Sequence, residues 1–194
     1  YHHHLKERAV RMAGNRVVGS AYADFRTSVP LFTFPRTLKT NRHVMRAETD
    51  VPVRYVRWYA SPAKFNVVVA EVAFHERDTG REIPFTVLDL PDAIYGFGED
   101  KMTDGDVLTT FQAKEPGSQV LTFDLGGLYR LDDMLFVPHN DGNYIEAGDE
   151  YELFYHAGVD GWKSLGRQTA VSDSLVYENV PCNAVFWLRD LTKG

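Results

Sequence analysis

The chain has 194 residues, of which 44% are hydrophobic, 25% are charged and 13% are aromatic, and its formal net charge is −6. The aromatic share excludes a disordered chain, and no run of about 18 apolar residues occurs, so no membrane-spanning helix is expected. The single cysteine, Cys182, excludes an internal disulfide and a cysteine-based zinc finger.

The first half of the chain predicts one short helix and two strands. Residues 5–12 are the only stretch with a helical pattern, and no convincing cap begins it. Residues 53–59 and 66–74 are rich in β-branched and aromatic side chains, which favour strands. Pro62 marks a turn between these two strands.

The second half predicts a series of short strands. In residues 119–125, Leu121, Phe123 and Leu125 occupy alternate positions and should share one face of a strand. The other strand-like segments are residues 131–137, 151–155, 174–177 and 184–188. Turn residues separate them, at Pro138, 140–143, Asp160-Gly161 and Pro181. Short strands at this spacing predict an all-β protein built as an antiparallel β-sandwich.

A domain boundary is expected between residues 76 and 100. Residues 77–80 have the composition of a turn that leaves a strand, and Pro84, Pro91, Gly96 and Gly98 follow with acidic residues between them. We place the boundary near residue 78, which divides the chain into residues 1–78 and 79–194.

Two groups of motifs carry a family resemblance. One contains Asp104-Gly105-Asp106 and ends at Asp124-Leu125-Gly126; the other is Arg54-Tyr55-Val56-Arg57 followed by the hydrophobic residues 69–74 around Glu71. They resemble the early signature and the last two strands of discoidin, or coagulation-factor type C, modules. Residues 15–20 resemble the middle of such a module. The resemblance implies a galactose-binding-like jelly roll.

The order of these motifs bears on the domain organisation, because the ending signature comes before the beginning signature. The resemblance therefore implies the C-terminal part of a first discoidin-like β-sandwich in residues 1–78 and a second one in residues 79–194. The alternative is one permuted sandwich that uses both parts. Either arrangement suggests that the chain is part of a larger parent protein.

A narrower resemblance involves the last third of the chain. Residues 139–143, 148–155, 165–169 and 187–192, together with Trp162, look like the C-terminal modules of large secreted Bacteroidetes proteins, some with an upstream transglutaminase-like domain. This resemblance implies a secreted, periplasmic or cell-surface location, and other domains of a larger parent chain as partners.

Charge is distributed unevenly along the chain. Residues 1–50 carry nine Lys/Arg and four Asp/Glu, whereas residues 101–194 carry seven Lys/Arg and fifteen Asp/Glu. An acidic C-terminal half disfavours nucleic acid, because phosphate contacts need clustered basic residues, and no nucleic-acid partner is expected. It is compatible with a bound divalent cation, or simply with a solvated acidic surface.

Asp104, Asp106 and the carbonyl of Thr109 are candidate calcium ligands. Calcium prefers six to eight oxygen atoms from carboxylates and carbonyls. In similar carbohydrate-binding modules, the equivalent loop often holds a structural Ca²⁺. The competing interpretation is a turn in which Asp104 caps backbone amides and Gly105 supplies a positive φ.

A glycan or glycoprotein is the expected ligand. Sugar recognition needs an exposed aromatic ring with planar polar groups beside it. The candidates in the expected loops are His139, Asn140, Asp141, Asn143, Tyr144 and Trp162. The alternative interpretation places Trp162 and Trp187 in the core or at a sheet edge, and makes residues 140–143 a turn.

The sequence predicts no catalytic residues. Glu150 and Glu152 share one face of a strand, whereas a glycosidase needs two carboxyl groups that face each other about 5–10 Å apart. Cys182 follows Pro181 at the entry to an apolar strand, where a buried thiol is the usual arrangement. We therefore expect a non-catalytic, carbohydrate-binding accessory module. The alternatives are a structural module that packs against a missing enzyme domain and, last, a hydrolase.

Overall fold

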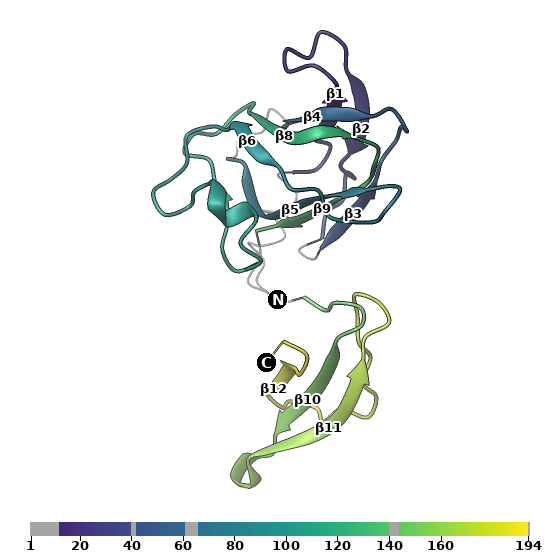
Figure 1. Ribbon diagram of the computed structural model, residues 1–194. Helices are drawn as coiled ribbons and strands as arrows, with labels where there is room; N and C mark the ends of the chain where they lie inside the picture. Colours follow the sequence, from purple (N-terminus) through teal and green to yellow (C-terminus); the bar gives the residue numbers. More distant parts are fainter. Residues whose placement is uncertain (1–11, 40–41, 61–65, 140–143, 194) are drawn as a thin grey trace. The chain divides into compact units, whose positions relative to one another are not determined.

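The computed structural model describes residues 12–39, 42–60, 66–139 and 144–193, and its strands form three antiparallel sheets (Figure 1). The chain divides into two units, Tyr1–Gly142 and Asn143–Gly194. The prediction of an all-β antiparallel sandwich is confirmed. Within the described residues, no helix has the length and apolar character needed to cross a membrane.

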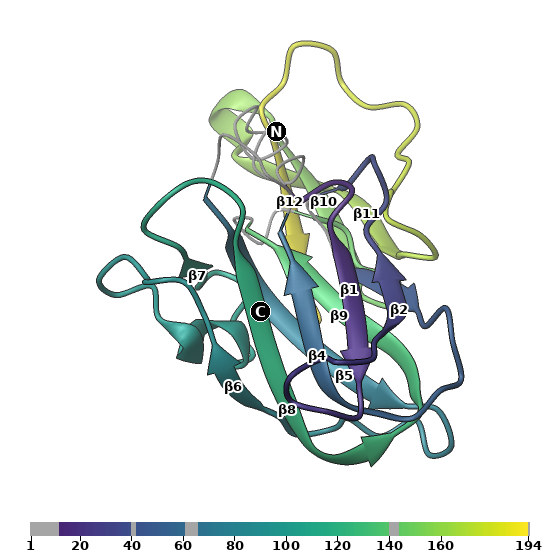
Figure 2. The ribbon, with the colours of Figure 1, turned by 90° about the horizontal axis from the view of Figure 1, so that it is seen from above.

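The larger unit is a sandwich of two sheets. The five-stranded sheet has the order β2-β1-β4-β8-β6, formed by Val29–Thr33, Arg16–Ser20, Val53–Tyr59, Val120–Tyr129 and Thr86–Asp89. The four-stranded sheet has the order β3-β9-β5-β7, formed by His43–Arg46, Leu131–Pro138, Val68–Glu76 and Phe111–Gln112. Figure 1 shows the two sheets as stacked layers, and Figure 2 looks onto the five-stranded one.

The core of the larger unit lies between these sheets. Leu121, Phe123 and Leu125 of β8 are all buried, which confirms the alternation predicted for this strand. Trp58 of β4 stacks on Phe34, with ring centroids 4.9 Å apart. A short 3₁₀ helix, η1 (Glu99–Met102), closes one side of the sandwich by burying Met102.

The structure corrects the boundary expected near residue 78. Strands from both sides of that position pair within each sheet: β4 pairs with β8, and β5 pairs with β9. Residues 77–80 do form a turn, where the Gly80 N–H donates to the Glu76 carbonyl, but the turn lies inside one sandwich. The division between units falls at residues 142 and 143 instead. The larger unit is therefore one sandwich built from strands on both sides of residue 78, and residues 143–194 form a separate unit.

The smaller unit contains a three-stranded sheet with the order β11-β10-β12. Its strands are β10 (Glu150–His156), β11 (Trp162–Thr169) and β12 (Phe186–Asp190), and the 3₁₀ helix η2 (Gly158–Asp160) links the first two. Tyr151 and Ala170 are its only buried hydrophobic residues among those described. The small core leaves most of this unit's apolar side chains at its surface.

Several predicted elements differ from the structure. Residues 174–177 do not form a strand; the Tyr177 hydroxyl donates to the Tyr151 carbonyl, so this segment is held by side chains. The last strand begins at Phe186, two residues later than expected. The helix expected at residues 5–12 lies outside the described residues except for Met12, which is in a turn.

Candidate carbohydrate-binding face

One face of the smaller sheet is rich in aromatic side chains. Side chains alternate between the two faces along a strand, so Phe154 and His156 of β10 point to the same side. The antiparallel register places Trp187 of β12 opposite Phe154, and Trp162 of β11 opposite His156. Directly opposed residues share a face, which brings these four rings together.

These four residues, Phe154, His156, Trp162 and Trp187, form what we call the aromatic face. The ring centroids of Phe154 and Trp187 lie 5.5 Å apart, those of Trp162 and Trp187 lie 5.9 Å apart, and those of His156 and Trp162 lie 5.2 Å apart. The indole planes of the two tryptophans meet at 64°. The rings therefore form one continuous but non-planar cluster.

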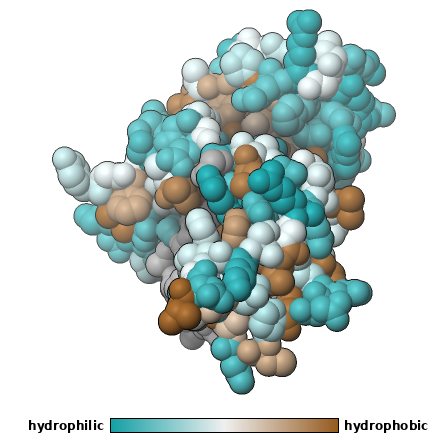
Figure 3. All heavy atoms as spheres, turned by 90° about the horizontal axis from the view of Figure 1, so that it is seen from below, coloured by the Kyte–Doolittle hydropathy of each residue, from teal (hydrophilic) through white to brown (hydrophobic). Residues whose placement is uncertain are grey.

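The aromatic face is open to solvent. Trp162 is 46% exposed and Trp187 is 47% exposed, although buried tryptophans are the usual arrangement. Figure 3 colours one side of the surface by hydropathy and shows apolar residues, in brown, scattered among hydrophilic ones, without marking the aromatic face itself. Exposed indole rings offer an apolar surface together with an N–H donor, so they suit a ligand that is apolar on one side and polar at its edges.

A polar rim borders the aromatic face. The carboxylate of Glu152 accepts hydrogen bonds from Ser164 Oγ at 2.7 Å and from Arg167 Nε at 3.2 Å. The Arg167 guanidinium also lies 4.0 Å from the Glu150 carboxylate. These contacts confirm that Glu150 and Glu152 share a strand face. Arg189 lies opposite Glu152 in the register of β12.

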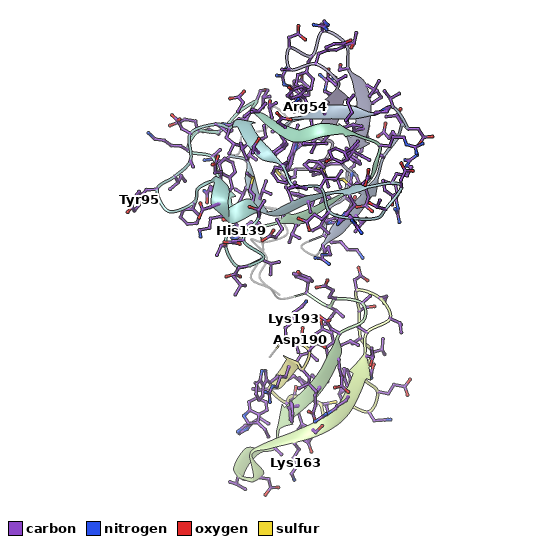
Figure 4. The ribbon with its side chains drawn as sticks, viewed as in Figure 1. Arg54, Tyr95, His139, Lys163, Asp190 and Lys193 are labelled. Carbon is purple, nitrogen blue, oxygen red and sulfur yellow. The ribbon has the colours of Figure 1, made fainter. Side chains whose placement is uncertain are left out.

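The described residues among those predicted to bind sugar belong to both units. Trp162 lies on the aromatic face, whereas Tyr144 lies beside Lys193, whose Nζ is 5.8 Å from the Tyr144 ring centroid. His139 follows β9 in the larger unit (Figure 4). The remaining candidates, Asn140, Asp141 and Asn143, lie outside the described residues.

The predicted set did not include Phe154, His156 or Trp187. The alternative interpretation placed Trp162 and Trp187 in the core or at a sheet edge, and both do lie in edge strands, β11 and β12. An alternating Phe154-x-His156 pattern was visible in the sequence, but it does not indicate which strands flank it. A β-bulge between Glu152 and Phe154 shifts the register against β11, and this shift determines which residue of β11 meets His156.

The loop predicted to hold calcium forms a hydrogen-bonded turn. Asp104 Oδ1 accepts from the Asp106 N–H at 3.0 Å, and Asp104 Oδ2 accepts from the Thr109 hydroxyl at 2.7 Å. Asp106 Oδ1 accepts from the Leu108 N–H. Gly105 has φ = 77°, so the competing interpretation of this loop as a turn capped by Asp104 is confirmed. The hydrogen bond from Thr109 and the nearby Lys101 ammonium lower the pKa of Asp104.

A carboxyl group with a raised pKa lies beside this loop. Burial of the Glu71 side chain on β5 raises its pKa to about 7, while a hydrogen bond from the Gly105 backbone opposes the rise. The Asp104 and Glu82 carboxylates add to the rise. A raised pKa at Glu71 was not predictable from the sequence, because only the fold brings this residue against residues 104 and 105.

Cys182 is exposed, which corrects the expectation of a buried thiol. It precedes β12 instead of entering it, since the strand begins only at Phe186. An exposed position needs no apolar packing, so the burial preference of small thiols does not apply here.

The fold and this face define an all-β chain with a solvent-exposed aromatic surface on its smaller sheet. Comparison of the chain with protein families, with curated proteins and with solved structures found no match.

Proposed function

We propose that this chain is a non-catalytic carbohydrate-binding region of a secreted or surface protein, and that the aromatic face binds the sugar. The observation that carries the proposal is the continuous cluster of Phe154, His156, Trp162 and Trp187, with both indoles nearly half exposed. A pyranose ring has an apolar face of C–H groups and a rim of hydroxyl groups, and the aromatic face offers the complementary arrangement.

The chemistry of binding follows from the two parts of the site. Contact between a sugar and an exposed indole removes apolar surface from water, which stabilises the complex by about 1–2 kcal/mol per ring. The rim supplies the Ser164 hydroxyl, the Glu152 carboxylate and the Arg167 guanidinium, which can donate to or accept from sugar hydroxyls. Their mutual hydrogen bonds hold them in place before the ligand arrives, which reduces the entropy cost of binding.

The arrangement of carboxyl groups supports a binding role over hydrolysis. Glu150 and Glu152 lie on one strand and share the Arg167 guanidinium. A glycosidase instead places two carboxyl groups on opposite sides of the scissile bond, about 5–10 Å apart. The proposal therefore assigns no catalytic step to these residues.

Tryptophan fluorescence and affinity electrophoresis test the proposal with a panel of neutral polysaccharides. Trp58 is fully buried, so a change in emission on adding polysaccharide reports on Trp162 and Trp187. We expect Trp162→Ala and Trp187→Ala each to weaken binding at least tenfold, which corresponds to the loss of about 1.4 kcal/mol. The matched control is Tyr95→Ala, because Tyr95 is fully exposed on a loop of the larger unit (Figure 4) and should bind like the wild type.

Two results would contradict this proposal. The first is that wild-type protein binds none of the polysaccharides. The second is that the Trp162→Ala variant binds as tightly as wild type. Either result would show that the aromatic face does not bind sugar. The first result favours the alternative function, in which the chain is a structural module that packs against another domain of its parent protein.

Calcium binding by Asp104, Asp106 and Thr109 is a separate prediction. An ion there has to replace the hydrogen bond from Thr109 to Asp104 and compete with the Lys101 ammonium, which lies 3.4 Å from Asp104 Oδ2. We therefore expect weak affinity, on the order of the millimolar range known for extracellular modules. Calcium should raise the thermal midpoint of wild type but not of Asp104→Asn, and equal midpoints of wild type in calcium and in chelator would contradict the prediction.

A further inference from the structure

The outer surface of the five-stranded sheet and the loop between β1 and β2 together carry four arginines that each contact an aromatic ring. We call this surface the arginine–aromatic face, and it consists of Arg16, Tyr22, Phe25, Arg26, Arg54, Tyr55, Arg57 and Tyr59. Figure 2 looks onto this sheet, and Figure 4 labels Arg54 on it. This face belongs to the larger unit and is independent of the aromatic face proposed to bind neutral sugar.

The ring contacts are close. The guanidinium carbon of Arg57 lies 3.8 Å from the Phe25 ring centroid, and that of Arg16 lies 4.7 Å from the Tyr59 centroid. Arg26 lies 3.4 Å from the Tyr22 centroid. A guanidinium that rests on a ring is held in one orientation and keeps its N–H groups at its edge, where they can meet an anion.

The strand register makes this face continuous. Arg16 of β1 lies opposite Tyr59 of β4, and Val18 lies opposite Arg57. Arg16 and Arg57 are therefore diagonal neighbours on adjacent strands, with backbones about 7–8 Å apart. The two guanidinium groups can contact neighbouring groups of one extended ligand.

The loop between β1 and β2 positions Phe25 under Arg57. Phe25 has φ = 53°, a backbone conformation that residues other than glycine rarely adopt. Its N–H donates to the Tyr22 carbonyl at 3.0 Å, and Ser20 Oγ donates to the Thr27 carbonyl at 2.6 Å. These bonds hold the loop in place, so this part of the face is ordered before a ligand binds.

Acidic neighbours neutralise two of the four arginines. Arg54 forms a bidentate pair with Asp124, at 2.8 and 2.9 Å, and Arg26 lies 3.6 Å from Asp24. Within the described part of the chain, Arg57 donates only its Nε, to the Thr122 hydroxyl at 3.2 Å. Among the described residues, Arg16 and Arg57 have no carboxylate partner, and both keep their terminal N–H groups free for a ligand.

We infer that this arginine–aromatic face binds an acidic polysaccharide, whose carboxylate or sulfate groups are held by Arg16 and Arg57. A guanidinium matches the two oxygens of such a group with two parallel N–H donors. Arg16 and Arg57 are the two arginines of this face without a carboxylate partner among the described residues. Two such arginines suit a polymer that carries at most one anionic group per sugar unit.

A nucleic acid fits the same face less well. Duplex DNA carries one charge per about 1.7 Å, and proteins that bind it commonly make about 6–10 phosphate contacts. Binding of single strands relies on bases that stack on open aromatic rings, but arginines already cover one side of Phe25, Tyr22 and Tyr59.

The test is affinity electrophoresis of the full chain in gels that contain polygalacturonate, a sulfated polysaccharide or a neutral polysaccharide. We expect retardation in at least one acidic gel, and at least tenfold weaker binding for the double variant Arg16→Gln/Arg57→Gln. The matched control, Arg36→Gln/Arg130→Gln, removes the same charge from exposed arginines elsewhere in the larger unit and should bind within twofold of wild type. The two acidic gels distinguish carboxylate from sulfate as the group recognised.

Each other outcome has a defined meaning. If the test and control variants lose the same amount of affinity for the acidic polysaccharide, binding depends only on the net charge of the protein. That result would overturn the inference. Loss of acidic-polysaccharide binding in Trp162→Ala/Trp187→Ala, with Arg16→Gln/Arg57→Gln unaffected, would assign that ligand to the aromatic face of the smaller unit. A single-stranded oligonucleotide that binds more tightly than the polysaccharides, and loses affinity in Arg16→Gln/Arg57→Gln, would show that the ligand of this face is nucleic acid.

Discussion

Replacing Trp58 with alanine is expected to lower the free energy of unfolding of the larger unit by about 3–5 kcal/mol. Trp58 is fully buried between the two sheets, where it stacks on Phe34 and meets Phe136 edge to face with centroids 5.4 Å apart. Alanine removes these contacts and leaves a cavity that the surrounding strands can close only in part.

A second variant separates the ring contacts from the indole N–H. Among the residues that the structure describes, the buried Nε1 of Trp58 has no hydrogen-bond partner, which costs free energy in the folded state. Trp58→Phe removes this N–H and keeps most of the aromatic contacts, so it should cost about 2 kcal/mol less than alanine.

Urea unfolding followed by circular dichroism measures both variants against wild type. Trp187→Ala is the control, because it removes an exposed tryptophan from the smaller unit and should leave the larger unit's transition unchanged. A loss below about 1 kcal/mol in Trp58→Ala would show that this ring does not support the core as described.

The stability of the larger unit is expected to fall as the pH rises from about 4.5 to 7, because of Glu71. Burial raises the pKa of the folded-state Glu71 carboxyl to about 7 from its ordinary value of 4.5. In this window the unfolded chain carries an ionised Glu71, whereas the folded chain keeps it protonated. The folded state then binds more protons, so its stability decreases with rising pH and levels off above about pH 7.

The size of this effect follows from the shift in pKa. A shift from 4.5 to about 7 sets an upper limit of about 3 kcal/mol, which solvent screening of a half-buried carboxyl reduces to about 1–2 kcal/mol. In Glu71→Gln, the glutamine side chain has nearly the same shape as a protonated glutamate but does not ionise. It should match wild type at pH 4.5 and exceed it by about 1–2 kcal/mol at pH 8.

Urea unfolding at four pH values between 4.5 and 8 checks this prediction. The difference between wild type and Glu71→Gln isolates Glu71 from the histidines and from the neighbouring Asp104 and Glu82, since those groups are present in both proteins. A difference that does not change with pH would show that Glu71 is ionised in the folded protein throughout.

The local properties of individual segments were predictable from the sequence. Alternation of Leu121, Phe123 and Leu125 with outward-facing residues correctly predicted β8 and its buried face, because the side-chain period of a strand is a local property. The turn at residues 104–106 was also predictable, because its interactions are local. Asp104 Oδ1 accepts a hydrogen bond from the amide two residues away, and Gly105 adopts a positive φ.

Pairing between distant segments was not predictable in the same way. The Gly- and Pro-containing stretch after residue 78 has the composition of a linker, but β4 pairs with β8 across it. Composition reports whether a segment favours a turn or a strand, and it carries no information about which strand lies beside it. The division between the units therefore fell at residues 142 and 143 instead of near residue 78.

The aromatic share of the chain was known from composition alone, and it excluded a disordered chain. Composition could not predict which of those rings lie in the core and which lie on the surface. Trp58 and Trp187 both lie in strand-forming sequence, and only the tertiary structure buries the first between two sheets and exposes the second on a sheet face. The physical reason is that burial depends on whether a second layer covers a strand's face, and the chain's own sequence around each tryptophan does not encode that layer.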